Sequence, residues 1–224
     1  MINTDINGNI GIISIDRPPV NAINPELVSS LSECLSSYQS NNSINGVVLQ
    51  GRSGIFSAGL DITHLFPKDR DYIKNFWENF SGLLNQMFTY EKPLYSSISG
   101  HCPAGGTVMV IMTDYRVMSK GKYVIGLNEV DVGLTVPHGI GSVFQYVVGE
   151  RNAEDLLLKA KLISPEDALK VGLVDEICDL ENILDIVLER IDSAANLHSN
   201  QQVLTKKILR DQVTNLILQN FNND

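Results

Sequence analysis

One carboxylate lies at the end of a short apolar run. Residues 125–129 read Ile-Gly-Leu-Asn-Glu, which predicts a buried strand that ends at Glu129. A carboxylate beside a ligand can remove and return a proton, which is general acid–base chemistry. About twenty residues earlier, where a partner acid would be sought, Gly105-Gly106-Thr107-Val108 offers a valine. A single acid favours a proton shuttle over the addition of water. Taken alone, Glu129 could also be a solvated loop acid.

Two segments rich in small residues could supply the rest of such a site. Residues 56–61 read Phe-Ser-Ala-Gly-Leu-Asp, and residues 100–106 read Gly-His-Cys-Pro-Ala-Gly-Gly. Each follows a predicted strand and leads into a helix, and ligands of α/β sheets bind at that end of the strands. Free N–H groups, one from each loop, could hold a carbonyl oxygen that becomes negative during a reaction. On spacing alone, both segments could also be ordinary turns.

The elements that must position these segments predict an α/β fold with a largely parallel sheet. Asn7-Gly8 predicts a hairpin, and Asn24-Pro25-Glu26 predicts a helix start with a cap, a proline and an acid in order. Val47-Val48-Leu49 is typical of a strand buried on both faces. Strands are also expected at 10–16, 94–99, 115–118, 123–125 and 174–177, and helices at 72–88, from 106 to about 113, from 165 to Gly172, and from 180 onward with a polar break at 196–201.

Composition sets the class of protein. With 224 residues, 43% hydrophobic and 19% charged, the chain can bury one sizeable core. The net charge of -9 argues against a nucleic-acid surface, although a few local donors could still hold a phosphate. The three cysteines are widely spaced and the four histidines show no ligand spacing, so we expect buried thiols and no metal.

No run reaches the roughly 18–20 apolar residues of a membrane span, and the first residues lack the layout of a signal or transit peptide. We therefore expect a cytosolic protein, or one of the mitochondrial matrix if the chain is a processed form.

These motifs, and the order in which they follow one another along the chain, resemble those of the crotonase (enoyl-CoA hydratase/isomerase) superfamily. Residues 56–62 resemble its first oxyanion segment, and residues 99–106 resemble its second. Residues 125–134 are similar to the catalytic segment of one branch, the mitochondrial-type Δ3,Δ2-enoyl-CoA isomerases, and residues 164–174 also fit the family. The likeness covers almost the whole chain.

The resemblance implies a crotonase-type (ClpP/crotonase) spiral of ββα units over residues 1–195, and a short C-terminal helical region at 196–224 that could serve oligomerisation. It implies an acyl-CoA thioester as substrate, no separate cofactor, and a homotrimer or a dimer of trimers. The backbone N–H groups of Leu60 and Gly105 would hold the thioester oxygen, and Glu129 would be the acid/base. The residues implied to contact substrate are Ala58, Gly59, Leu60, Asp61, Ile62, Gly105 and Asn128.

The departure at Val108 separates two activities of this family. Hydratases of the family carry a second glutamate at the position that falls on Val108. Adding water needs two carboxylates, whereas moving a double bond from C3–C4 to C2–C3 needs one base and an oxyanion hole. The resemblance therefore implies a Δ3,Δ2-enoyl-CoA isomerase. The alternatives are a hydratase or another crotonase reaction, with Asp131 as a possible second acid, and a non-catalytic acyl-CoA-binding protein.

The sequence suggests roles for four charged residues. Asp61 is expected to cap the helix that follows Leu60. Lys68, Lys74 and Lys92 are candidates for the CoA phosphates by charge alone, and surface lysines are usually only solvated.

Overall fold

Two sheets organise the chain, in a computed structural model that describes residues 1–195, 197 and 200–219. Within these residues, the larger sheet has six strands in the order β1-β2-β3-β5-β7-β9, antiparallel between β1 and β2 and parallel elsewhere. Its strands are β1 (Ile2–Asn7), β2 (Ile10–Ile15), β3 (Gly46–Gln50), β5 (Leu94–Ile98), β7 (Tyr115–Ser119) and β9 (Glu176–Cys178). The smaller parallel sheet has the order β4-β6-β8, with β4 (Gly54–Ile55), β6 (Gly100–Pro103) and β8 (Ile125–Gly126).

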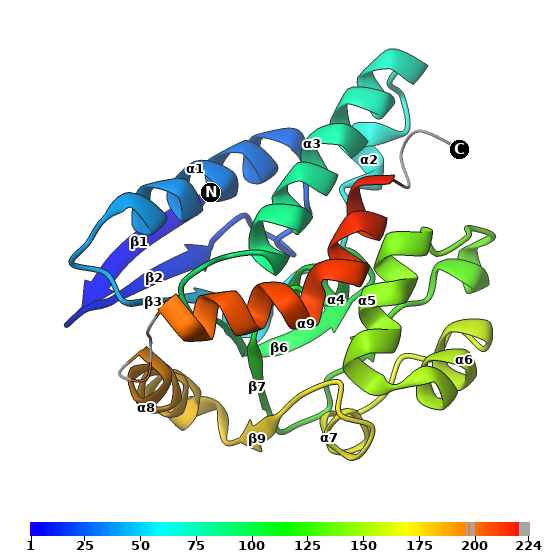
Figure 1. The fold of residues 1–224 in the computed structure, drawn as a ribbon. Coiled ribbons are helices and arrows are strands. Elements are labelled where there is room, and N and C mark those ends of the chain that lie inside the picture. Colours follow the sequence, from blue (N-terminus) through cyan, green and yellow to red (C-terminus); the bar gives the residue numbers. More distant parts are fainter. Residues whose placement is uncertain (196, 198–199, 220–224) are drawn as a thin grey trace.

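Each strand of the smaller sheet comes directly after a strand of the larger one and leads into helix. β3 and β4 precede α2 (Ile62–Leu65) and α3 (Arg70–Phe88), and β5 and β6 precede α4 (Gly105–Val110). β7 and β8 precede the 3-10 helix η1 (Glu129–Val132), α5 (His138–Val148) and α6 (Glu150–Leu158). This repetition confirms the predicted spiral of ββα units (Figure 1). The other helices described are α1 (Pro25–Ser40), α7 (Pro165–Lys170), η2 (Leu180–Asn182), α8 (Ile183–Ala195) and α9 (Asn200–Gln219).

Two of the predicted helix starts, those of α1 and α7, are confirmed. The Asn24 side chain accepts a hydrogen bond from the N–H of Leu27 at 3.0 Å, and Pro25 occupies the first helical position of α1. The Ser164 side chain caps α7 in the same way, through the N–H of Asp167 at 3.1 Å. On one face of α1, Leu27, Leu31, Leu35 and Tyr38 are buried and Cys34 is half-buried.

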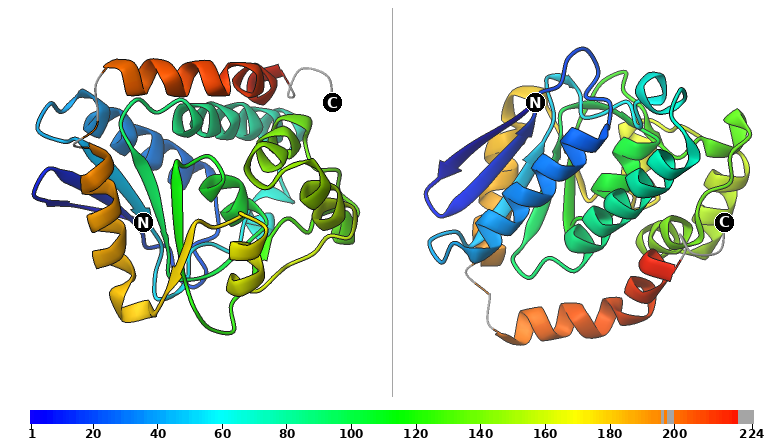
Figure 2. Two further views of the ribbon diagram at one scale, coloured as in Figure 1. Left: turned by 60° about the horizontal axis from the view of Figure 1, so that its bottom comes forward. Right: turned by 90° about the horizontal axis from the view of Figure 1, so that it is seen from above.

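Strands β2, β3, β5 and β7 of the larger sheet are largely buried, whereas β1 at its edge is mostly exposed. In β3, Val47 and Leu49 face the main core, whereas Val48 faces a second apolar cluster. Residues of α1, α3, α4 and α5 build the main core, and residues of α8 build the second cluster (Figure 2). The alternation follows from the two-residue period of a strand, and it confirms the prediction for this apolar run.

The C-terminal helix α9 lies across α3 and α5 (Figures 1 and 2). The Asp114 carboxylate anchors it through Lys206 Nζ at 2.7 Å and Arg210 at 2.9 Å, and all three side chains are largely buried. Residue 196, where the predicted C-terminal region begins, lies outside the described residues, and so do residues 198 and 199 of the predicted polar break. The division and the polar break therefore stay predictions. Among the described helices, none is long and apolar enough to cross a membrane.

Two helices, α5 and α6, were missed by the sequence prediction. Gly139 and Gly141 lie in the first turn of α5 and indicate a loop when read alone, but Ile140, Val143 and Phe144 are buried in the core. Tertiary packing therefore outweighs the low helix propensity of glycine here. The strand predicted at 123–125 is β8 at Ile125–Gly126, and the helix predicted to end near 113 ends at Val110.

Candidate active site

The loops that carry the predicted site residues leave one edge of the smaller sheet. β4 and β6 are parallel, with Ile55 opposite His101, and β6 and β8 are parallel, with Pro103 opposite Gly126. The three loops that follow these strands hold Leu60, Gly105 and Glu129, in that order. Because parallel strands end at the same edge, the fold brings the three predicted segments together there.

The first two loops touch at Gly59 and Gly105. A Cβ placed on Gly105 would lie 3.1 Å from Gly59 Cα and 3.3 Å from Leu60 N. A Cβ placed on Gly59 would lie 3.1 Å from Gly105 N. The amides of Leu60 and Gly105 are therefore neighbours, and both glycines are required for this approach.

Neither of these amides has a hydrogen-bond acceptor among the described residues. Across the part of the chain that the structure describes, no hydrogen bond is donated by the N–H of Leu60 or of Gly105, whereas the adjacent N–H of Asp61 donates to Ile23 O at 2.8 Å. Gly105 is buried and Leu60 is half-buried. Two neighbouring donors without partners form a site for an oxygen that gains negative charge.

A strained residue precedes the second donor. Ala104 has φ 50° and ψ -124°, a conformation that costs a non-glycine residue about 1–3 kcal/mol. Its N–H donates to Gly126 O at 2.8 Å, and its carbonyl accepts from Val108 N at 3.0 Å. These two bonds hold the turn that starts α4 at Gly105. The role of Ala104 was not predicted, because backbone strain has no signature in a single sequence.

Glu129 is the first residue of η1 and is half-buried. Its Oε2 atom is buried and has no hydrogen-bond partner among the described residues. Burial raises the pKa of Glu129, and a hydrogen bond from its own backbone N–H only partly opposes this. A carboxylate with a raised pKa and an unused buried oxygen is suited to exchange a proton with a bound molecule.

No second carboxylate stands at the position expected for a hydratase. Val108 lies in the second turn of α4 and is 3% exposed. Asp131, the acid next to Glu129 in η1, is exposed to solvent. Asn128 is half-buried and its carbonyl accepts from the N–H of Asp131 at 3.1 Å. Glu129 is therefore the partly buried acid of this loop.

The remaining predicted contact residues lie on the first loop and at the start of α2. Ala58 and Ile62 are exposed, and Gly59 is buried. Asp61 caps α2 as expected, because its Oδ1 accepts from the N–H of His64 at 3.0 Å, and its Oδ2 pairs with Arg17 at 2.6 Å. Burial opposes the charge of Asp61, but these two partners hold its pKa below the usual value. Substrate contact by these residues stays a prediction.

A cavity of about 690 Å³ opens beside the third loop. Its wall begins at Val130, the residue after Glu129, and continues through η1, α5 and α6. Apolar side chains of Leu134, Val136 and Leu157 line it together with Gln145. Within the described residues, no three His, Cys, Asp or Glu side chains gather as a metal ion would require.

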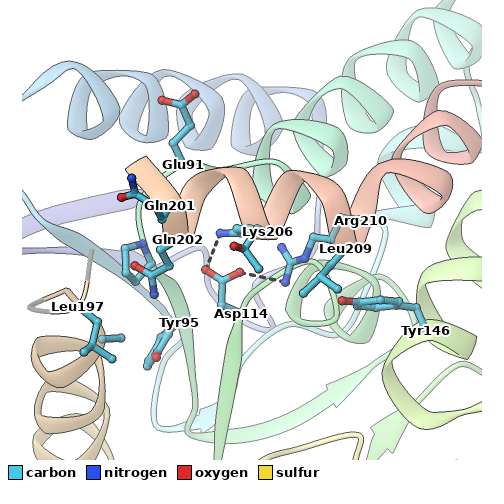
Figure 3. Close-up of a pocket in the computed structure, with 13 residues that line it drawn as sticks. Glu91, Tyr95, Asp114, Tyr146, Leu197, Gln201, Gln202, Lys206, Leu209 and Arg210 are labelled. Carbon is cyan, nitrogen blue, oxygen red and sulfur yellow. Dashed lines mark hydrogen bonds and ion pairs between the residues drawn. The ribbon is translucent and has the colours of Figure 1, made fainter. Parts of the chain in front are cut away.

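The pocket in Figure 3 is a different place in the fold. It has a volume of about 520 Å³ and lies under α9, where Pro93 precedes β5 and Asp114 precedes β7. Asp114 points at Lys206 and Arg210, so the charges there are paired with one another (Figure 3). This pocket is at the amino ends of the strands, and it contains none of the predicted site residues.

The fold and the site define a class of protein, and comparison with known proteins gives its family. The enoyl-CoA hydratase/isomerase family model matches residues 5–224, and the chain belongs to this family. It is 32% identical over 222 residues to mitochondrial enoyl-CoA delta isomerase 1 of Mus musculus, covering 98% of this chain and 77% of the mouse protein. The human protein of the same name is 30% identical, over 94% and 70% of the two chains.

Structural comparison agrees with the family. The crystal structure of human mitochondrial Δ3-Δ2-enoyl-CoA isomerase matches with a TM-score of 0.94 and 28% identity, over 98% of this chain and 90% of that chain. In sequence, a probable enoyl-CoA hydratase of Rhizobium meliloti is also similar, at 25% identity over 89% of this chain and 77% of its own. The predicted family and fold are confirmed, and the chain is an enzyme of the enoyl-CoA hydratase/isomerase family.

Proposed function

We propose that this enzyme moves the double bond of a 3-enoyl-CoA thioester to the 2-trans position, with Glu129 as the only acid/base. The observation that carries the proposal is the combination at one sheet edge of a partly buried carboxylate, Glu129, and two unused amides, Leu60 and Gly105. A buried valine, Val108, stands where a hydratase would need its second acid.

The reaction needs no atom besides those of the substrate. The Glu129 carboxylate takes a proton from C2, the electrons of that C–H bond form a C1–C2 double bond, and the carbonyl π electrons move onto the thioester oxygen while the C3–C4 double bond is kept. The charge of the resulting dienolate rests largely on the thioester oxygen, held by the N–H groups of Leu60 and Gly105. Each such donor contributes about 3 kcal/mol to lowering the barrier. Glu129 then returns its proton to C4: the C3–C4 π electrons bind the proton, the C1–C2 electrons become the C2–C3 double bond, the carbonyl re-forms, and the carboxylate of Glu129 is restored.

The cavity beside the third loop is the proposed place for the acyl chain. Its wall begins at Val130, the residue after Glu129, and Leu134, Val136 and Leu157 give it an apolar lining. CoA arrives as part of the substrate, so no separate cofactor is proposed. A homotrimer or a dimer of trimers remains the expectation for assembly, and light scattering of the purified protein tests it.

The test compares Glu129→Gln with Asp131→Asn, a matched loss of charge two residues away. Conversion of 3-enoyl-CoA is followed by the ultraviolet absorbance of the conjugated thioester. We expect Glu129→Gln to lose about 10²–10⁴-fold in kcat while acyl-CoA still binds, because the base itself is removed. Asp131→Asn should retain activity, because this side chain is exposed. Full turnover by Glu129→Gln would refute the proposal.

Hydration is measured on 2-enoyl-CoA with the same variants. Negligible water addition by the unmodified enzyme supports the isomerase. Robust hydration that Asp131→Asn abolishes would assign the second acid to Asp131 and make the protein a hydratase. Binding of acyl-CoA with neither reaction would indicate a non-catalytic acyl-CoA-binding protein.

A further inference from the structure

A buried asparagine lies behind the first oxyanion loop. Asn21 is 0% exposed and has φ 52°, a left-handed conformation that asparagine adopts more readily than most residues. Its Oδ1 accepts from the N–H of Arg17 at 2.8 Å. Its Nδ2 donates to Ile15 O and to Phe56 O, each at 2.9 Å. The side chain thus ties the end of β2 to the start of the loop that carries Leu60.

A second connection leads from Asn21 toward the Leu60 amide. The Ser57 hydroxyl donates to Asn21 O at 2.7 Å and accepts from the N–H of Gly59 at 3.2 Å. Ser57 is fully buried. Gly59, with φ 97°, is the residue directly before Leu60. The orientation of the Leu60 N–H is therefore connected to Asn21 through one hydroxyl group.

The two segments also run side by side. Ala58 N donates to Val20 O at 3.0 Å, and Ile23 N donates to Gly59 O at 2.8 Å. On its other side, Gly59 touches Gly105. The donor loop is thus held between the Asn21 segment and the loop of the second donor, and movement of the Asn21 segment would change the spacing of the two amides.

We propose that Asn21 and Ser57 are positioning residues that set the direction of the Leu60 N–H toward the thioester oxygen. The inference rests on the proposed function, because it assumes that Leu60 donates to the substrate. A preorganised donor acts on the transition state only if its geometry is held to within about 0.5 Å. Glycine at position 59 supplies no such restraint itself, so the restraint comes from the backbone hydrogen bond between Ile23 and Gly59 together with the side chains of Asn21 and Ser57.

Two variants remove different parts of this connection. Ser57→Ala deletes the hydroxyl between Asn21 and Gly59 and leaves Asn21 in place. Asn21→Gly keeps the left-handed backbone and the carbonyl that Ser57 uses, but removes the three side-chain hydrogen bonds. Ser96→Ala is the matched control, because Ser96 is equally buried but its hydroxyl bonds Thr113 at 3.1 Å, in the larger sheet.

The readouts separate positioning from folding. With 3-enoyl-CoA, we expect kcat to fall about tenfold or more in Ser57→Ala and Asn21→Gly, since removal of one oxyanion donor typically costs 10²–10³-fold. KM should stay within about threefold, because most CoA contacts are unchanged. The carbonyl stretch of bound butyryl-CoA, carbon-13 labelled at the carbonyl, is measured by difference infrared spectroscopy. It should be lowered on binding to the unmodified enzyme, and less so in both variants.

The possible outcomes are distinct. A carbonyl stretch that is lowered in the unmodified enzyme and in Ser96→Ala, but partly restored in both positioning variants, supports the inference. An equally lowered stretch in all four proteins, with equal kcat, overturns it and leaves the proposed function intact. If the unmodified enzyme does not lower the stretch, the oxyanion assignment itself fails and the inference fails with it. The infrared signal reports only folded, ligand-bound protein, so partial unfolding of a variant does not imitate a loss of positioning.

Discussion

Replacing Gly105 by alanine tests the contact between the two donor loops. The new Cβ would lie 3.1 Å from Gly59 Cα, 3.3 Å from Leu60 N and 3.0 Å from the Cδ1 of the buried Ile23. Ordinary contacts of this kind are 3.4–4 Å, so the loops must separate by a few tenths of an ångström. The backbone of Gly105 lies outside the left-handed region, so the substitution adds no strain of its own.

The magnitude follows from what the separation does. A donor that is removed completely costs about 10²–10³-fold in kcat. A donor displaced by a few tenths of an ångström loses part of that, and we expect kcat to fall by about 10- to 100-fold, or about 1.4–2.7 kcal/mol. The crowding should also lower the free energy of unfolding by about 1–3 kcal/mol.

Gly82→Ala is the control for this substitution. Gly82 lies within α3, is exposed, and a Cβ there meets nothing within 4 Å. Alanine should raise stability by up to about 1 kcal/mol without changing kcat. Steady-state kinetics and thermal unfolding are measured on both variants. Equal kcat in Gly105→Ala, Gly82→Ala and the unmodified enzyme would refute the assignment of the oxyanion site to these loops.

Three further predictions concern pH, the anchor of α9 and the sheet contact. Burial raises the pKa of Glu129, so the contribution of Glu129 to stability is complete below its unfolded-state pKa and is lost as pH rises through its folded-state pKa. Glu129→Gln should therefore raise the Tm at pH 7 but not near about pH 4. An equal gain in Tm at both pH values would contradict this. Asp114→Asn leaves Lys206 and Arg210 without their carboxylate and should cost about 3 kcal/mol in chemical denaturation, against at most about 1 kcal/mol for Glu91→Gln at an exposed pair. Gly100→Ala puts a Cβ 1.9 Å from the backbone of Gly54, so circular dichroism should show no native fold.

Some features of this fold follow from local chemistry and were predicted for that reason. The hydrogen bond of the Asn24 cap spans three residues, and the run at 47–49 is apolar at every position, so both signals are contained in a few neighbouring residues. The starting residues of α5 act differently. Glycines at 139 and 141 disfavour helix locally, and only burial of residues such as Phe144 offsets them. A single sequence does not contain that burial.

The candidate site shows the same division. Leu60, Gly105 and Glu129 were identified because each lies in a motif that resembles a known family. Asn21 and Ser57 were missed, since an asparagine between valine and alanine has no distinguishing pattern. Their role is visible only when the segment at 17–23 is placed beside the segment at 56–61. Residues that position a donor act through contacts between segments distant in the sequence, so they are identified from the three-dimensional structure.

The burial of Glu129 and the exposure of Asp131 explain how one acid can serve the proposed reaction. A base that removes a proton from carbon benefits from a higher proton affinity, and desolvation raises the pKa of Glu129 in that direction. The two amides act on the substrate rather than on the base, because they stabilise the charge that the thioester gains as the proton leaves. The two effects bring the proton affinities of base and carbon closer together. Proton transfer then becomes feasible in both directions, as it must be when the same carboxylate returns the proton to a second carbon.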